Sequence, residues 1–171
     1  MPVGTTVHRL EIVPSTNDAA RSLALGGAAH GTAVVAHGQS RGRGTKGRAW
    51  HSPPGLGLYA SFILRGPGGG PLPSPHLLPL AAGLAASDAI RVEAGVEVRL
   101  KWPNDLVFER RKLGGILSEG VAGAPGGDFA VVGIGINVGH ELGDLPPDLR
   151  TSATSLCLAG AAAATIDSLF D

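Results

Sequence analysis

The segment Gly38-Gln-Ser-Arg-Gly-Arg-Gly-Thr-Lys-Gly-Arg-Ala-Trp50 concentrates residues that can bind an anion. It holds four cations, four glycines and one aromatic residue, and no acidic residue occurs between Ala19 and Ser87. Arginine pairs with carboxylate and phosphate oxygens in a fork, and glycine lets the backbone approach a ligand closely. The segment therefore predicts an anion site, although a solvated basic loop would explain the same charges.

Three later segments place polar residues or bare backbone at the ends of expected strands. The sequence Lys101-Trp-Pro-Asn-Asp105 ends a strand at its proline, so its last two side chains should project from a turn. In Arg111-Lys-Leu-Gly-Gly-Ile-Leu117 and Val131-Val-Gly-Ile-Gly-Ile-Asn-Val138, glycines leave part of a strand face without side chains. A flat ligand could lie on such a face. An Asx turn, a bulge or close backbone packing would explain these segments without a ligand.

Length and composition predict a single domain, residues 1–171, that is long enough to bury a core. Fourteen basic and fourteen acidic side chains give a net charge of zero, so no global field favours nucleic acid or a membrane. The single cysteine, Cys157, excludes an internal disulfide and fits a reducing compartment. The N-terminus lacks a signal-peptide pattern, and no apolar run reaches the roughly 18 residues of a membrane span. We therefore expect a cytoplasmic protein.

Hydrophobic patterning predicts the elements that position these segments. Strands are expected at 7–13, 32–36, 56–64, 97–101, 106–109, 113–121 and 129–136. Helices are expected at 15–25, 76–94 and 159–170, the first with a capping box at Ser15-Thr-Asn-Asp18 and a stop at Gly26-Gly27. Many strands with few helices favour an α+β domain, in which helices pack on a mixed β-sheet.

Five motifs, taken together and in this order, resemble the catalytic domain of biotin protein ligases, also called biotin-[acetyl-CoA-carboxylase] ligases. They are Ser15-Thr-Asn17, the glycine-rich segment 38–50, KWPND, RKLGGIL and GIGIN, and they cover the chain to about Val138. The resemblance implies the fold shared by lipoate ligases and class II aminoacyl-tRNA synthetases. It implies an ATP-dependent ligase that uses ATP with Mg²⁺ to convert biotin to biotinyl-5'-AMP and pyrophosphate. The biotinyl group would then pass to a lysine of a biotin carboxyl carrier protein.

The resemblance also assigns roles to individual residues. Arg43 would cover the biotin carboxylate, Arg48 would bind the nucleotide phosphates, and Lys112 would bridge the carboxylate and the reacting phosphate. Such cations suit a step that brings two anions together. Asp105 would orient or deprotonate the acceptor lysine. Biotin binding is expected from Ser15, Thr16, Asn17, Gln39, Gly42, Arg43, Lys112, Gly115 and Leu117, and nucleotide binding from Arg48, Trp50, Asn104, Lys112 and Asn137.

The sequence departs from the family pattern in three places. Thr45 stands where many members have a further basic residue, so we expect weaker retention of the adenylate unless Lys46 substitutes. No DNA-binding segment precedes the Ser15-Thr-Asn17 motif, and the chain stops at Asp171, before the small C-terminal β-domain that the family usually adds. We expect a monofunctional ligase whose partner is the carrier protein, without DNA or membrane binding, and the sequence leaves a homodimer open.

Other functions fit parts of the sequence. Gly42-Arg-Gly-Thr-Lys-Gly47 matches G-x-G-x-x-G, but a dinucleotide site needs a helix directly after it and an acid about 20 residues on, and neither is present. A lipoate or octanoyl transfer enzyme of the same fold is one alternative. A basic nucleic-acid-binding module is another, against which the scarcity of aromatic residues counts. The six histidines show no metal-ligand spacing, so no metal site is expected.

Overall fold

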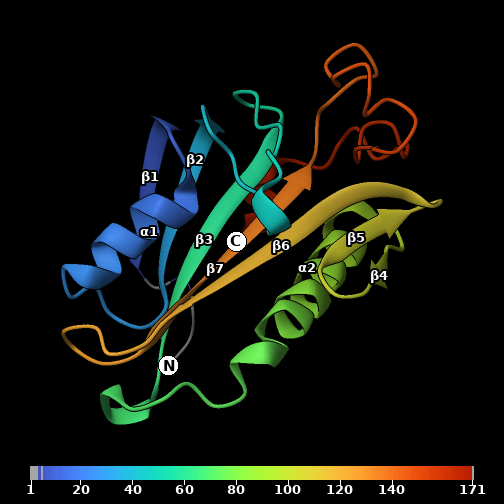
Figure 1. Ribbon diagram of the computed structural model, residues 1–171. Coiled ribbons are helices and arrows are strands. Elements are labelled where there is room, and N and C mark those ends of the chain that lie inside the picture. Colours follow the sequence, from blue (N-terminus) through green and yellow to red (C-terminus); the bar gives the residue numbers. More distant parts are fainter. Residues whose placement is uncertain (1–3, 5, 171) are drawn as a thin grey trace.

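A seven-stranded β-sheet forms the centre of the computed structural model, which describes residue 4 and residues 6–170 (Figure 1). The strands are β1 (Thr6–Val13), β2 (Thr32–Gln39), β3 (Gly57–Arg65), β4 (Arg99–Lys101), β5 (Asp105–Phe108), β6 (Arg111–Val121) and β7 (Phe129–Asn137). Their order in the sheet is β1-β2-β3-β7-β6-β5-β4. The β1–β2 pair is parallel and the other pairs are antiparallel. The predicted α+β class with a mixed sheet is confirmed.

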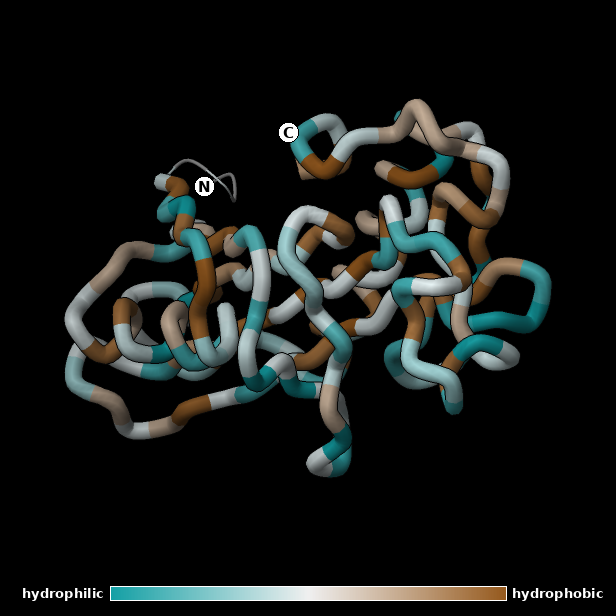
Figure 2. Tube along the Cα trace, turned by 90° about the horizontal axis from the view of Figure 1, so that it is seen from above, coloured by the Kyte–Doolittle hydropathy of each residue, from teal (hydrophilic) through white to brown (hydrophobic). Residues whose placement is uncertain are grey.

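Helices cover both faces of this sheet. Helix α1 (Thr16–Leu25) packs on β2, β3 and β7, while α2 (Leu78–Ala94) packs on β4 to β7 and α3 (Ile166–Phe170) on β3 and α2. Alternate residues of a strand point to opposite faces, so Val34 joins the core under α1 and Val35 joins the core under α2 and α3. Figure 2 colours the chain by hydropathy and shows hydrophilic stretches at several of the outer loops.

Two expectations about helix ends are wrong. The predicted helix 159–170 is helical only from Ile166, because Gly160 adopts a φ of 88° and turns the chain before it. The reciprocal bonds between Thr165 and Ser168 then cap the short helix. Ser15 is the N-cap residue of α1 but makes no capping bond with its side chain. Within residues 6–170, no helix is long and apolar enough to cross a membrane.

Candidate active site

A cavity of about 380 Å³ lies on the sheet face that α1 covers only in part. The start of α1, the segment 38–50, the β4–β5 turn, strands β6 and β7 and the segment 145–153 all contribute to its wall. The predicted site residues that line it are Ser15, Thr16, Asn17, Gln39, Arg43, Arg48, Trp50, Asn104, Asp105, Lys112, Gly115, Leu117 and Asn137. Gly42 does not line it, but its carbonyl accepts the backbone N–H of Trp50 at 2.9 Å. Five motifs that are far apart in the sequence therefore share one cavity.

The corner of the cavity at the start of α1 is uncharged and hydrogen-bonded in advance. Ser15, Thr16 and Asn17 are all buried. The backbone N–H of Thr16 donates to Gln39 Oε1 at 2.8 Å, and the Ser61 hydroxyl lies 2.6 Å from Asn17 Oδ1, which accepts its proton, and 2.8 Å from the Thr16 hydroxyl. Because Thr16, Asn17 and Gln39 are hydrogen-bonded to other protein groups, the corner presents donors and acceptors in a preset arrangement.

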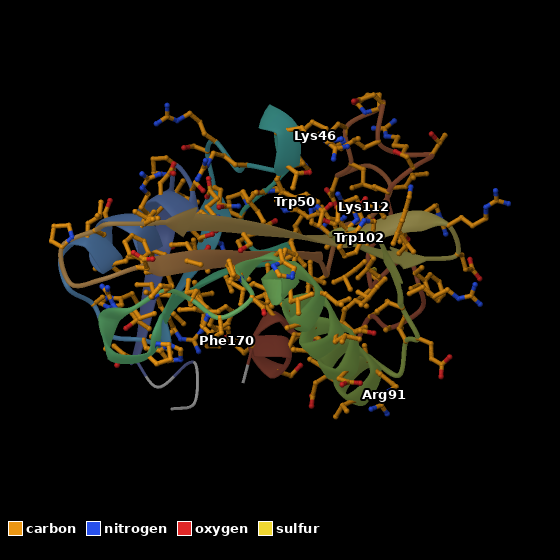
Figure 3. The ribbon with its side chains drawn as sticks, turned by 60° about the horizontal axis from the view of Figure 1, so that its bottom comes forward. Lys46, Trp50, Arg91, Trp102, Lys112 and Phe170 are labelled. Atoms are coloured by element: carbon orange, nitrogen blue, oxygen red, sulfur yellow. The ribbon has the colours of Figure 1, made fainter. Side chains whose placement is uncertain are left out.

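Lys112 brings a positive charge into the same cavity from β6. Its Nζ donates to Asp105 Oδ1 at 2.6 Å and lies 5.4 Å from the centre of the Trp50 ring (Figure 3). Backbone bonds hold its position, since its N–H donates to Ser152 O and its carbonyl accepts from Thr154 N. The ammonium group is thus fixed between a carboxylate and an aromatic face, with part of its surface open to the cavity.

The bare strand faces that the glycines predicted are partly filled by other side chains of the chain itself. A Cβ atom on Gly135 would lie 2.7 Å from Trp50 Nε1, and one on Gly115 would lie 3.6 Å from the same indole ring. A Cβ atom on Gly133 would collide with Asn17 Oδ1. Of the two interpretations that the sequence left open at Gly133 and Gly135, close packing by protein describes the structure, in which Asn17 and Trp50 occupy the room.

Trp50 itself carries an unmet hydrogen-bonding group. Its Nε1 is buried, and no acceptor lies within bonding distance of it among the described residues. A buried N–H without a partner costs free energy. Nε1 lies against Gly135 of β7, so Trp50 offers the cavity its ring face rather than this donor.

Two acidic residues that the sequence analysis missed neutralise Arg43. Its guanidinium forms a fork with Glu119, with NH1 to Oε1 at 2.9 Å and NH2 to Oε2 at 2.7 Å. Asp18 Oδ1 lies 2.8 Å from the same NH2. The segment has no acid near it in sequence, but the sheet and α1 bring two acids to it in space. Glu119 shares a strand face with Gly115 and Leu117, and this alternation was the signal that could have revealed it.

The remaining cations of the segment differ in position. Arg48 lines the cavity and bonds Thr45, with NH2 to Oγ1 at 3.1 Å and Nε to the carbonyl at 3.3 Å. Thr45 lines the cavity as well, whereas Lys46 is exposed at the tip of the segment and outside the cavity wall (Figure 3). Lys46 is therefore poorly placed to substitute for a cation at position 45.

Comparison with known proteins decides the family. The model of the biotin/lipoate A/B protein ligase family matches residues 10–137. The chain belongs to this family. It is 40% identical over 146 residues to the bifunctional ligase/repressor BirA of Bacillus subtilis (strain 168), which covers 85% of this chain and 44% of that protein. It is 41% identical over 127 residues to the biotin--[acetyl-CoA-carboxylase] ligase of Paracoccus denitrificans, which covers 72% of this chain and 51% of that one. The chain spans about half the length of these curated relatives.

Solved structures of biotin protein ligases agree with this family assignment. The enzyme from Aquifex aeolicus in complex with biotin and ATP superposes with a TM-score of 0.76 at 31% identity, over 97% of this chain and 67% of that one. The enzyme from Leishmania major in complex with biotinyl-5-AMP gives 0.71 at 31% identity, over 98% and 74%. The predicted resemblance is confirmed, and so is the expected fold of biotin ligases and class II aminoacyl-tRNA synthetases.

Two asparagines of this cavity use their side-chain amides to bond neighbouring segments of its wall. Asn137 is buried and donates through Nδ2 to Thr154 O at 2.9 Å. Asn104 donates through Nδ2 to Ile116 O at 3.2 Å, and its backbone carbonyl accepts from Ile116 N. Both side-chain amides therefore hold neighbouring segments in place, which leaves mainly their oxygen atoms for a ligand.

Two histidines beside the cavity were not predicted as part of it. His51 lines the cavity, and its Nε2 lies 2.9 Å from Asp144 O, a carbonyl to which the ring can only donate. His140 is fully buried behind it, with its ring centre 6.0 Å from that of His51. Burial, and secondarily the charge of His51, lower the pKa of His140. His140 is therefore held in its neutral form.

Proposed function

We propose that this domain activates biotin with ATP to biotinyl-5'-AMP and transfers the biotinyl group to a lysine of a biotin carboxyl carrier protein. One observation carries the proposal: a single cavity combines an uncharged, pre-bonded polar corner with cationic side chains. Biotin has a neutral ureido head, an apolar ring and chain, and a carboxylate. The corner suits the head, Gly115 and Leu117 suit the apolar part, and Lys112 suits the carboxylate.

The first step joins a biotin carboxylate oxygen to the α-phosphorus of ATP, and pyrophosphate leaves with the bonding electrons. Lys112 stands where the carboxylate and the phosphate meet and offsets their repulsion. Arg48 binds the phosphates, and Arg43 covers the carboxylate. Trp50, Asn104 and Asn137 contact the nucleotide.

Mg²⁺ would enter with the nucleotide. Among the described residues, no three His, Cys, Asp or Glu side chains are grouped so as to bind a metal ion. Asp105, the one carboxylate among the described residues that line the cavity, already accepts from Lys112. The residues present therefore do not fit a protein cage for the ion, and its ligands would come from the triphosphate and water.

The second step is an attack of the acceptor lysine amine on the biotinyl carbonyl, which releases AMP. The amine must lose a proton to attack, and Asp105 is the carboxylate at hand in the cavity wall. We assign Asp105 to orient the amine or to accept its proton. Lys112 then pairs with the phosphate of the AMP that is released. The carrier protein is the partner of this reaction, in the cytoplasm.

Isothermal titration calorimetry tests the proposal. Biotin should bind this domain, and a non-hydrolysable ATP analogue with Mg²⁺ should tighten that binding by about tenfold or more, because the two ligands share one cavity. Lipoic acid is the matched control, since it carries the same carboxylate on a different ring. Absence of biotin binding, or equal binding of lipoic acid, would contradict the proposal. Salt-sensitive binding of RNA without any effect of ATP would favour a nucleic-acid-binding module instead.

A further inference from the structure

The Arg43 side chain is the most heavily paired cation on the cavity wall. Its two terminal nitrogens meet three carboxylate oxygens, two from Glu119 and one from Asp18, at 2.7 to 2.9 Å. One positive charge is thus opposed by two negative ones. Neither acid lines the cavity.

Glu119 also joins Arg43 to the polar corner. Its Oε2 accepts from Asn17 Nδ2 at 2.8 Å in addition to the Arg43 fork. Asn17 in turn lies against Gly133 and accepts from Ser61. One carboxylate therefore connects β6, the start of α1 and the glycine-rich segment.

The glycine-rich segment behaves as one hairpin between Gly42 and Trp50. Arg43 and Ala49 form an antiparallel bridge, Gly44 N donates to Arg48 O at 2.7 Å, and Trp50 N donates to Gly42 O at 2.9 Å. A force that holds Arg43 therefore also holds Arg48 and Trp50, two residues of the hairpin that line the cavity.

We propose that Glu119 and Asp18 form an acidic clasp on Arg43, which fastens the glycine-rich hairpin over the cavity before any ligand binds. Glu119 is then a positioning residue of the site. Isolated surface ion pairs contribute little, but forked geometry and a network of charges are the conditions under which they do contribute. Arg43 covers the biotin carboxylate by closing the hairpin over it, and Lys112 supplies the charge that faces that carboxylate. This consequence for biotin rests on the proposed function, whereas the clasp itself does not.

Hydrogen exchange of the ligand-free protein tests the clasp directly. The variant Glu119→Gln keeps an acceptor for Asn17 but removes the negative charge, and Asp18→Asn removes the second acid. Asp88→Asn is the matched control. Asp88 forms an exposed pair with Arg91 on α2, and Figure 3 shows Arg91 well away from Lys46 of the hairpin. We expect exchange at residues 42–50 to rise about threefold to tenfold in Glu119→Gln, less in Asp18→Asn, and not in Asp88→Asn. Unchanged exchange in both clasp variants would overturn the proposal.

Steady-state adenylation then tests the effect on the site. The KM for biotin should rise by about threefold to tenfold in Glu119→Gln, while kcat at saturating biotin and ATP stays within about twofold of wild type, because bound ligands hold the hairpin themselves. A KM that falls would mean that the acids compete with the substrate for Arg43, and a constant KM would mean that they do not affect its binding; either result would refute the positioning role. If wild-type protein showed no adenylation, the proposed function would fail, and the exchange experiment would still decide on the clasp.

Discussion

Replacement of Lys112 by alanine should slow adenylation far more than it weakens biotin binding. The substitution removes the ammonium group placed at the meeting point of two anions and leaves Leu117 and the polar corner unchanged. Loss of one such charge contact costs on the order of 100-fold to 1000-fold in rate. Fold stability should change little, because the Lys112–Asp105 pair is partly exposed and the backbone bonds of Lys112 do not depend on its side chain.

Asp105 makes the expected loss larger. The pair has a net charge of zero, and in Lys112→Ala the carboxylate of Asp105 is left unpaired beside the reacting anions. Two like charges about 4 Å apart repel by about 4 kcal/mol at an effective dielectric constant of about 20, an upper figure for an open cavity. The double variant Lys112→Ala with Asp105→Asn should therefore regain about tenfold of the lost rate.

Pyrophosphate exchange is the appropriate assay, because it reports the first step and does not involve the acceptor lysine for which Asp105 is proposed. Biotin affinity, measured by calorimetry, separates binding from chemistry. Near wild-type exchange in Lys112→Ala would refute the role of Lys112. A double variant no faster than the single one would show that the Asp105 charge does not act on this step.

Three further substitutions test other parts of the cavity. Gly135→Ala should displace the Trp50 indole, whose Nε1 lies 2.7 Å from the position that the new methyl group would take, and weaken binding of the non-hydrolysable ATP analogue by about tenfold or more in calorimetry. Because burial lowers the pKa of His140 below its ordinary value of 6.5, the unfolded chain binds more protons in acid, so urea unfolding should show stability falling as pH drops through that value, and His140→Phe should reduce this dependence. Thr45→Arg should slow release of free adenylate by about tenfold, since position 45 lines the cavity; an unchanged release rate would show that its side chain does not face the intermediate.

The sheet could be predicted because its strands carry their own local signals. Alternating glycine and isoleucine in 131–138 and the proline in 101–105 indicated where β7 forms and where β4 ends, and both are found there. The helix expected at 159–170 was mostly wrong for the opposite reason. Its alanines favour a helix by propensity, but Gly160 at positive φ turns the chain, so only the last five residues are helical.

The cavity could be predicted from ordered motifs, but its charge balance could not. Glu119 is 76 positions from Arg43, and no local pattern connects the two. Their contact depends on the β6–β7 register, which places Leu117 opposite Gly133. This register fixes where along the sheet, and on which face, the Glu119 side chain lies. Side-chain alternation alone gives the face, and only the folded sheet gives the distance.

The glycines at 133 and 135 show why a bare strand does not by itself identify a ligand surface. Both lie on one face of β7, where the room that they leave is taken by Asn17 and Trp50 from the first third of the chain. A larger residue at either position would first collide with the Asn17 or Trp50 side chain, and only then with a ligand. In the proposed function the flat part of the nucleotide would meet the Trp50 ring, so nucleotide binding would depend on how firmly the hairpin that carries Trp50 is held. Because the Arg43 side chain bonds that hairpin to β6, the proposed clasp would act on nucleotide binding although neither acid lines the cavity.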